Sequence, residues 1–446
     1  YNTLIRALDV LGLTNEAGES RIPLLVLNVV YPLVPEQITT FCKDKQGVMI
    51  IEEGQPEFIE QEVATHLQRS QSRTALHGKD FLSMGGEYTA EILIRGIQAF
   101  TDTYPANVVP AVVPSYLPRL DETRQTATQI LKQPLPARPP NFCTGCPERP
   151  VFSALKLVER EVGKLHIAAD IGCHALATFA PFSFGHSILG YGMSMASSAA
   201  VKNFSARRPI AIMGDGGFWH NGLLSGVSST LLNQGDGVLV IMKNGYTSAT
   251  GTQETVSSPD SASKLIAQGH SATSTEMTIE RTLEGMGVKW LRTVHNYKVS
   301  KVQDTLREAL SSPFKGLKVI VAEGECQLER QRRLKPIQAM RLKQGLRMLR
   351  TRYGIDEDTC TGDHSCIRLS GCPTLTIKDA TDPLKSAPVA HVNNDCVGCG
   401  LCGEVADAAV LCPSFHKIEI VTNPSWWERF IARFNQWTIR QLQGQS

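Results

Sequence analysis

The sequence predicts an α/β protein of several domains, with a doubly wound domain in its middle and a small cysteine-rich module near its C-terminal end. Strand-type and helix-type segments alternate in two long runs, which is typical of parallel sheets covered by helices. A proline-rich stretch at 133–140 separates the two runs. The cysteines supply the third observation, because 11 of the 12 fall into two sets whose spacing indicates metal ligation.

The N-terminal run, residues 1–132, predicts a small α/β domain with a parallel sheet. We expect strands at Ile22–Val30 and Gly47–Ile51, where β-rich residues cluster, and helices at Glu36–Cys42 and Glu57–Leu67, where the apolar residues have helical periodicity. The chain starts at Tyr1 without a methionine and enters a helix-like pattern at once. We therefore expect it to be a piece of a longer polypeptide.

A second α/β domain is predicted at 141–330. Its expected strands are Leu165–Ala169, Pro209–Met213, Gly237–Met242 and Leu317–Ala322, with helices between them. A basic connector follows at 331–355 and is compatible with a helix. Nine of the 23 residues at 330–352 are Lys or Arg, which predicts a solvated helix face or a segment beside a polyanionic cofactor.

The module at 356–420 contains the compact cysteine set Cys396-Val-Gly-Cys399-Gly-Leu-Cys402, followed by Cys412-Pro. Three cysteines at three-residue steps can wrap a four-iron cluster, and a Cys-Pro follows them in bacterial ferredoxins. A zinc site normally takes its ligands as two separated pairs. Cysteines three apart on a tight turn seldom reach disulfide geometry. The spacing therefore predicts an iron–sulfur cluster.

A related half-motif lies upstream, where Cys360, Asp363, Cys366 and Cys372-Pro align with the four cysteines of the compact set. In two-cluster ferredoxins the fourth cysteine of each half ligates the other cluster. This rule assigns one site to Cys372, Cys396, Cys399 and Cys402, and the other to Cys360, Asp363, Cys366 and Cys412. Asp363 would be an oxygen ligand, with His364 as a weaker candidate. A three-iron cluster, or a degenerate half without a second cluster, stays open.

In the second domain, polar motifs follow the predicted strands at their carboxyl ends, where open α/β sheets bind ligands. Gly214-Asp215-Gly216 follows one strand, Asn244 follows the next, and 27 residues separate Gly216 from Asn244. This pattern is typical of thiamine-diphosphate enzymes, although Gly-Asp-Gly alone could be an ordinary tight turn. Magnesium needs oxygen ligands, here the Asp215 carboxylate, the Asn244 amide and the Tyr246 main-chain carbonyl. The residues expected at the cofactor are Gly172, His174, Gly214, Asp215, Gly216, Gly217, Asn244, Tyr246 and Thr247.

Four further cysteines are expected at the same edge. Cys143-Thr-Gly-Cys146-Pro opens the domain, and Cys173 and Cys326 each follow a predicted strand. Taken separately, the first two could be a redox dithiol or half a zinc site, and the others core cysteines. Together they predict a third cluster beside the diphosphate. Cys42 is left over and is interpreted as a core thiol.

These motifs resemble those of the 2-oxoacid:ferredoxin oxidoreductases, and most of all the indolepyruvate:ferredoxin oxidoreductases of the α-subunit type. The resemblance rests on the Cys143/Cys146 motif, Asp170-Ile-Gly-Cys173-His, Gly214-Asp215-Gly216 and the Cys396–Cys402 motif, and it covers nearly the whole chain. It implies a transketolase-C-like α/β domain at 1–132, a thiamine-diphosphate-binding domain at 141–330 and a bacterial-ferredoxin-like domain at 356–420. Asp363 departs from the family pattern and makes one cluster atypical.

The resemblance also implies an activity, which is the oxidative decarboxylation of a 2-oxoacid to acyl-CoA and CO2 with transfer of electrons to ferredoxin. An aryl pyruvate such as indolepyruvate is the implied substrate. The implied cofactors are thiamine diphosphate, Mg2+ and two to three [4Fe-4S] clusters, with coenzyme A as co-substrate.

The family's pyrimidine-binding domain, which carries the activating glutamate, would lie upstream of Tyr1. We find no replacement for that glutamate, since Glu254 is interpreted as a loop residue. We therefore expect weak cofactor binding by this chain alone, and activity only in a homo- or hetero-oligomer that includes that domain. The alternatives are an electron-transfer subunit without an active site and a non-oxidative thiamine-dependent decarboxylase or ligase.

Composition limits the other partners. A formal net charge of +2 argues against nucleic-acid or membrane attraction, and no apolar run approaches 18 residues. Cysteines in cluster spacing imply a reducing compartment, which predicts a cytoplasmic protein. The segment 421–446 is expected to be an amphipathic helix that docks onto the core or onto another subunit, because aromatic residues recur at helical spacing: Trp426, Trp427, Phe430, Phe434 and Trp437.

Overall fold

The computed structural model describes residues 1–105, 116–133, 140–258 and 277–443. The chain divides into two compact units, residues 1–137 and 138–446. The proline-rich linker expected at 133–140 lies outside the described residues except for its two ends. Among the described helices, none has the length and apolar character needed to cross a membrane.

The first unit contains two small cores. In one, α2 (Pro35–Cys42) and α3 (Phe58–Arg69) pack with a parallel sheet of β1 (Gly47–Met49) and β2 (Ala75–His77). The other is formed around α1 (Asn2–Val10) and α4 (Ala90–Thr103). The parallel arrangement, the strand predicted at Gly47–Ile51 and both predicted helices are confirmed, whereas the partner strand β2 was not predicted. Cys42 is buried in the core.

The strand predicted at Ile22–Val30 is wrong, because this segment forms no regular element. Pro23 and Pro32 remove backbone donors that a strand ladder would need. Val26, Val29 and Val30 are exposed, so the apolar run does not face a core. The long helix α5 (Tyr116–Leu131) has no buried residue and joins α4 through an Arg124–Glu91 ion pair at 2.6 Å.

The second unit is built on a six-stranded parallel sheet with the order β4-β3-β5-β6-β10-β9. The four strands predicted from apolar runs are confirmed to within two residues. Two short or half-exposed strands were not predicted, namely β4 and β9. The bounds are β3 (Ile167–Ala169), β4 (Ser187–Ile188), β5 (Ile210–Gly214), β6 (Val238–Lys243), β9 (Trp290–His295) and β10 (Lys318–Glu323).

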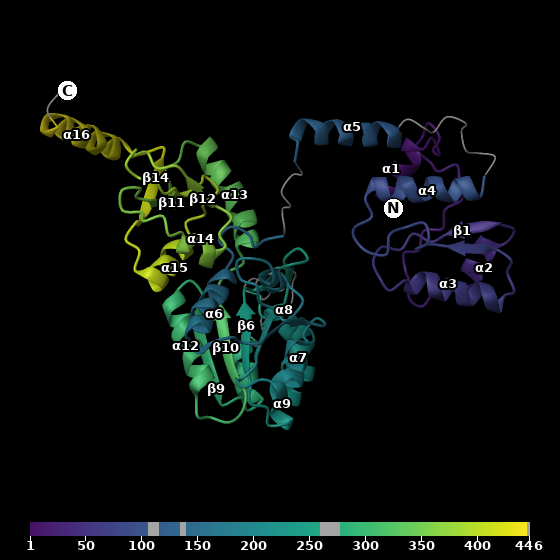
Figure 1. Ribbon diagram of the computed structural model, residues 1–446, viewed down its shortest axis with the longest axis horizontal. Helices are drawn as coiled ribbons and strands as arrows, with labels where there is room; N and C mark the ends of the chain where they lie inside the picture. Colours follow the sequence, from purple (N-terminus) through teal and green to yellow (C-terminus); the bar gives the residue numbers. More distant parts are fainter. Residues whose placement is uncertain (106–115, 134–139, 259–276, 444–446) are drawn as a thin grey trace. The chain divides into compact units, whose positions relative to one another are not determined.

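Helices cover both faces of this sheet (Figure 1). On one face lie α6 (Arg149–Val162) and α12 (Val299–Ser311), and on the other lie α7 (Ser194–Val201), the π-helix η3 (Phe218–Ser228) and α11 (Ile279–Gly285). Ile210 and Ile212 of β5 point into the first core, whereas Ala211 and Met213 point into the second. Because both faces are buried, these strands have continuous apolar sequences. The doubly wound architecture is confirmed.

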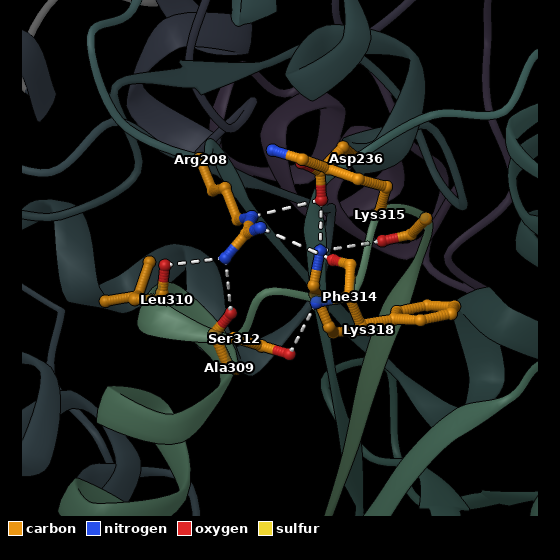
Figure 2. A network of polar contacts seen from close by, with 9 residues as sticks. Arg208, Asp236, Ala309, Leu310, Ser312, Phe314, Lys315 and Lys318 are labelled. Carbon is orange, nitrogen blue, oxygen red and sulfur yellow. Dashed lines mark hydrogen bonds and ion pairs between the residues drawn. The ribbon is translucent and has the colours of Figure 1, made fainter.

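A polar network ties together the amino-terminal ends of three strands (Figure 2). Lys318, the first residue of β10, is fully buried and contacts the carboxylate of Asp236, which precedes β6. Arg208 precedes β5, and its Nε donates to Asp236 Oδ1 at 3.0 Å. The same guanidinium donates to the Leu310 carbonyl at 2.7 Å, near the end of α12. This network therefore stabilises the edge of the sheet that lies opposite the expected cofactor edge.

Replacing Asp236 with alanine should destabilise the chain strongly. The change leaves the buried Lys318 ammonium without its carboxylate, and removing one partner of a buried ion pair costs about 3–5 kcal/mol. Urea denaturation would measure the free energy of unfolding. The control is Glu308→Ala, which breaks a pair with Arg292 that is nearly half exposed and should cost at most about 1 kcal/mol. Equal losses in the two variants would contradict a stabilising role for the network.

The basic connector is helical only in its first part. Helix α13 (Gln327–Lys343) ends before Gly345, which has a φ of +67°. The chain then forms β11 (Met348–Ile355), which pairs antiparallel with β14 (Phe415–Thr422). The expectation of a helical connector to residue 355 is therefore wrong. The strand β11 was not predicted because its exposed arginines interrupt the apolar residues.

The cysteine-rich module has two similar halves, and both lie in the sequence between these two paired strands. Strands β12 (Leu375–Lys378) and β13 (Val389–Val392) pair antiparallel, and each half contains one short helix, α14 (Ser365–Ser370) or α15 (Leu401–Val410). Leu369, Leu401 and Val405 belong to the same core as α6 and α12 of the sheet domain. The module is therefore packed against the sheet domain within one unit.

The C-terminal helix α16 (Trp426–Leu442) lies within the segment 421–446, for which an amphipathic helix was predicted. Ser425 and Glu428 cap it reciprocally, and Arg347 pairs with Glu428 at 2.6 Å. None of its described side chains is buried. The helix is confirmed, but docking onto the core of this chain is not found, and docking onto another subunit stays a prediction.

Candidate active site

The expected magnesium ligands lie together at the carboxyl edge of the sheet. Asp215 follows β5, and its Oδ2 accepts hydrogen bonds from the main-chain N–H groups of Asn244 at 3.1 Å and Gly245 at 2.6 Å, which follow β6. The Asn244 Oδ1 in turn accepts from Tyr246 N at 3.1 Å. The carboxylate, the amide and the main chain of Tyr246 thus form one hydrogen-bonded group around the end of two adjacent strands.

A second carboxyl group, Glu148, was not predicted to lie here. It is only 2% exposed, and its Oε1 accepts from Asn244 Nδ2 at 3.1 Å. Its Oε2 has no hydrogen-bond partner among the described residues. Burial and the nearby Asp215 raise the pKa of Glu148 to about 8, and burial raises the pKa of Asp215 to about 7. The negative charges of these two buried carboxyls disfavour each other's ionisation, and a nearby cation would relieve that cost.

Gly216 and Gly217 lie where the chain turns from β5 into a helix. Here α8 (Asp215–Gly217) continues into η3 and α9 (Ser229–Leu232), and π-helical geometry is frequent at functional sites. A Cβ on Gly216 would come within 2.3 Å of the hydroxyls of Thr247 and Tyr191, and one on Gly217 within 2.3 Å of Asp170 Oδ2. A larger residue at either position would displace these side chains, and the first N–H groups of the helix lie at the carboxyl edge of the sheet.

The loop after β3 supplies His174 and Asp170. His174 is 2% exposed, and neither ring nitrogen has a hydrogen-bond partner in the described part of the chain. Its Nδ1 lies 3.8 Å from Glu148 Oε2. Burial lowers the pKa of His174 to about 4, so the ring is neutral at pH 7. Buried polar atoms without partners are unusual in folded proteins, so this ring marks a polar site at the carboxyl edge of the sheet.

The structure brings together all the residues expected at the cofactor and adds Glu148, Asp170 and Tyr191. Asp170 was quoted only as part of a motif, yet its carboxylate accepts from Gly192 N at 2.7 Å, and burial raises its pKa to about 6. Tyr191 OH lies 3.3 Å from Thr247 Oγ1. The sequence contains a weak indication for Tyr191, because this residue stands between two glycines. Nothing in the sequence indicated Glu148, which the structure identifies by its burial.

The first cysteine set lies at the same edge and consists of Cys143, Cys146, Cys173 and Cys326. Burial, and then the charges of Glu148, Cys326 and Cys143, raise the pKa of the Cys173 thiol. Burial likewise raises the pKa of Cys146, with Cys173 among the neighbouring charges. All four are free thiols in the structure. Their donor chemistry and proximity fit an iron–sulfur cluster, and the cluster itself stays a prediction.

The Asp363 site is a cavity in the C-terminal module. It is lined by Cys360, Asp363, Cys366 and Cys412, together with His364. Asp363 also has a structural role, because its Oδ2 accepts from Ser365 Oγ at 2.6 Å and its Oδ1 from Ser365 N at 3.2 Å. A carboxylate oxygen has a second lone pair, so these bonds leave room for a metal bond.

The remaining set, Cys372, Cys396, Cys399 and Cys402, lies on the other side of the module, near α6. Burial raises the pKa of Cys402, and the charges of the other three members of the set act in the same direction. The two Cys-Pro motifs match each other in detail. Cys372 Sγ lies 3.1 Å from Thr374 Oγ1, and Cys412 Sγ lies 3.0 Å from Ser414 Oγ. This correspondence fits two half-repeats that exchange their fourth ligand.

In the described parts of the chain, no three His, Cys, Asp or Glu side chains are arranged around a single metal ion. The expected magnesium site requires only one carboxylate, with an amide and a main-chain carbonyl. An iron–sulfur cluster spreads its cysteines around several irons rather than one ion. The donor sets therefore fit the expected groups at the level of chemistry and proximity.

The fold and this edge define a class, the thiamine-diphosphate-binding α/β proteins. Residues 167–322 match the family model described as thiamine pyrophosphate enzyme, C-terminal TPP binding domain. This match contains the Asp215–Asn244 loops and His174.

Relatives among curated proteins cover most of the chain. The indolepyruvate oxidoreductase subunit IorA of Thermococcus kodakarensis is 26% identical over 405 residues, which is 87% of this chain and 56% of that protein. The subunit of Archaeoglobus fulgidus is 27% identical over 90% of this chain and 58% of its own length. That of Methanothermobacter thermautotrophicus is 25% identical over 93% and 58%.

Together with the thiamine-domain match, these relatives support a likeness of the chain to the 2-oxoacid:ferredoxin oxidoreductase family, and to its IorA subunits in particular. It spans between 56 and 59% of the length of the curated relatives. A solved 2-oxoglutarate:ferredoxin oxidoreductase from Magnetococcus marinus has a TM-score of 0.36 and 15% identity, over 44% of this chain and 66% of its own. That likeness is too distant to assign any residue a role.

Proposed function

We propose that this chain is the part of a 2-oxoacid oxidoreductase that holds thiamine diphosphate and carries electrons away from it to ferredoxin. The reaction is the oxidative decarboxylation of a 2-oxoacid to acyl-CoA and CO2. One observation carries the proposal, which is that the magnesium loop and the first cysteine set share an edge. Cys326 N donates to Asn244 O at 3.1 Å, so a main-chain hydrogen bond joins the proposed cluster ligand to the proposed magnesium ligand.

The chain's own residues would bind and orient the cofactor. Asp215, Asn244 and the Tyr246 carbonyl would hold magnesium, and the N–H groups of Gly216 and Gly217 would face the diphosphate. Bound thiamine diphosphate supplies an electron sink for decarboxylation, and iron–sulfur clusters accept electrons singly. His174, neutral and buried, can hold one proton on its ring and offer the other nitrogen as an acceptor.

The substrate is proposed to be an aryl pyruvate, because the relatives are named indolepyruvate oxidoreductase subunits. Coenzyme A is the proposed acyl acceptor. The three cysteine sets are proposed to act in the order Cys143–Cys326, then Cys372–Cys402, then the Asp363 site. The first set is placed nearest to the thiamine because Cys326 is hydrogen-bonded to Asn244. The second set is placed next because Arg149 of α6 interacts with cysteines of both sets.

The residue that activates the aminopyrimidine is proposed to come from another part of the protein or from a partner. Glu148 is bonded to Asn244 beside the magnesium loop, which gives it a role near the diphosphate. Glu254 lies in the short exposed strand β8 (Gln253–Glu254). A pyrimidine-binding domain would therefore complete the site, in an assembly of at least two copies.

Activity should consequently depend on that domain. The isolated chain, loaded with iron and thiamine diphosphate, is expected to reduce no ferredoxin with indolepyruvate and coenzyme A. Adding the pyrimidine-binding domain of an IorA relative, or expressing it in one polypeptide with residues 1–446, should restore the reaction. The assay is anaerobic ferredoxin reduction followed by absorbance. Full activity of the isolated chain would show that the activating group is inside it.

A further inference from the structure

A fully buried arginine lies between two of the cysteine sets. Arg149 is the first residue of α6 and has no exposed surface. Its Nη1 donates to the Ser370 carbonyl at 3.2 Å, and the guanidinium lies beside the Cys372 thiol, whereas Nε and Nη2 have no oxygen or nitrogen acceptor in the described structure. No carboxylate forms an ion pair with Arg149 among the described residues. A buried guanidinium in this state carries a large desolvation cost unless some negative charge compensates it.

The titratable groups that interact most strongly with this charge are cysteines from both sets. Cys372, Cys399 and Cys146 are, in that order, the thiols whose charges act most strongly on Arg149. A side-chain hydrogen bond links the Arg149 guanidinium to Cys372, and the Ser370 carbonyl that Arg149 contacts is only two residues from Cys372. Arg149 is thus placed to compensate negative charge on Cys146 of one set and on Cys372 and Cys399 of the other.

The two cysteine loops also touch each other. A Cβ on Gly145 would lie 2.5 Å from Val397 Cγ2, so the loop carrying Cys143 and Cys146 packs directly against the loop carrying Cys396 and Cys399. Gly145 has a φ of +74°, a conformation that favours glycine. Its carbonyl accepts a hydrogen bond from Tyr297 OH at 2.5 Å.

Around these loops the sheet domain and the module pack together, and their interface, called the seam below, is buried. Ser153, one turn after Arg149 on α6, donates to the Leu369 carbonyl at 2.7 Å. Phe142, Phe152, Leu401 and Val405 share one buried core. Water is therefore excluded from the region where Arg149 lies, and a charge in a dry region acts strongly on its neighbours.

We propose that Arg149 is a positioning residue for electron transfer, whose buried positive charge stabilises the reduced forms of the two clusters that meet at this seam. The proposal rests on the proposed function, because it requires clusters on both cysteine sets. A thiolate-ligated cluster is an anion and gains one negative charge when it takes up an electron, and nearby charge is one of the factors that set its reduction potential. Arg149 stays protonated throughout. If both cysteine sets held clusters, one electron would pass from the first to the second, and Arg149 would keep its bonds and its protons.

The effect should be larger on the second cluster. Two of its ligands, Cys372 and Cys399, precede Cys146 in the strength of their interaction with Arg149. The same charge therefore favours transfer from the thiamine-side cluster toward the module. The cysteines of the Asp363 site are not among the groups that act most strongly on Arg149, so the potential of that site serves as an internal reference.

The test is a redox titration of the iron-loaded full chain, followed by EPR under anaerobic conditions. Arg149→Met removes the charge, and Arg149→Lys keeps it without the guanidinium. Arg160→Met is the matched control, because Arg160 is an exposed residue in the last turn of the same helix. We expect Arg149→Met to shift the midpoint potential of the Cys372 cluster to more negative values, with a smaller shift for the thiamine-side cluster. Arg149→Lys should largely restore both, and Arg160→Met should change neither.

Unchanged midpoints in an Arg149→Met protein with normal iron content would overturn the proposal. If Arg149→Met loses its clusters, Arg149→Lys decides the matter. A charge-based role predicts that the lysine variant keeps its iron and its potentials, whereas a purely structural role of the guanidinium predicts that it loses iron in the same way. A wild-type chain that binds no iron on the Cys143–Cys326 and Cys372–Cys402 sets would refute the proposed function, and the role of Arg149 with it.

Discussion

Asp215→Asn should abolish the binding of thiamine diphosphate while the iron content of the chain stays normal. The substitution removes the one carboxylate among the three expected magnesium ligands and keeps the size of the side chain. Changes in the outer sphere of a metal site already cost about 10–100-fold in affinity, so loss of a direct anionic ligand should exceed about 100-fold. Thiamine diphosphate would be quantified in the protein after gel filtration in the presence of magnesium.

Glu254→Gln provides the control for this experiment. It makes the same carboxylate-to-amide change on an exposed residue of the loops after β6, and it should retain the wild-type cofactor content. Normal thiamine diphosphate in the Asp215→Asn protein would remove the magnesium assignment, even if the iron content were as expected.

Cys173→Ala should remove the thiamine-side cluster without removing the thiamine. Cys173 lies near Cys143, Cys146 and Cys326, and loss of one thiolate from a four-cysteine set should lower the iron content by about four atoms per chain. Thiamine diphosphate should still bind, because Asp215 and Asn244 are unchanged. In the completed assembly, transfer of electrons to ferredoxin should stop. Iron analysis, cofactor analysis and the ferredoxin assay measure these three properties.

The matched control is Cys42→Ala in the first unit, where the thiol is buried in an apolar core. This variant should keep all of its iron. If Cys173→Ala keeps its iron as well, Cys173 is an ordinary core cysteine and the thiamine-side cluster does not exist.

The sheet domain was predictable because its strands are buried on both faces. β5, β6 and β10 have continuous apolar sequences, and each precedes a motif or a cysteine at the carboxyl edge. β4 has only two residues, and β9 is mostly half-exposed, so neither has a clear apolar signal. The apolar run at Ile22–Val30 led to a wrong prediction because its valines are exposed and Pro23 lies within it.

The part of the site that could be predicted is the part with a characteristic spacing in the sequence. Asp215 and Asn244 were found because their separation repeats a known pattern, and the cysteine sets because of their short intervals. Glu148 and Arg149 follow the Cys146-Pro motif directly, yet charged residues near a turn are usually exposed. Only packing of α6 against the sheet and against the cysteine-rich module makes them buried, and that packing involves residues such as Ser370, which lies 221 positions away.

The most direct test of the account is anaerobic EPR of the chain assembled with its pyrimidine-binding domain, with two reductants compared on the same sample. We expect indolepyruvate plus coenzyme A to reduce the iron–sulfur clusters, and to do so only when thiamine diphosphate and magnesium are present. Dithionite should reduce the same clusters without these additions. Clusters that dithionite reduces and the oxoacid never reduces would contradict the central claim, and would leave the chain as an electron carrier without a thiamine reaction of its own.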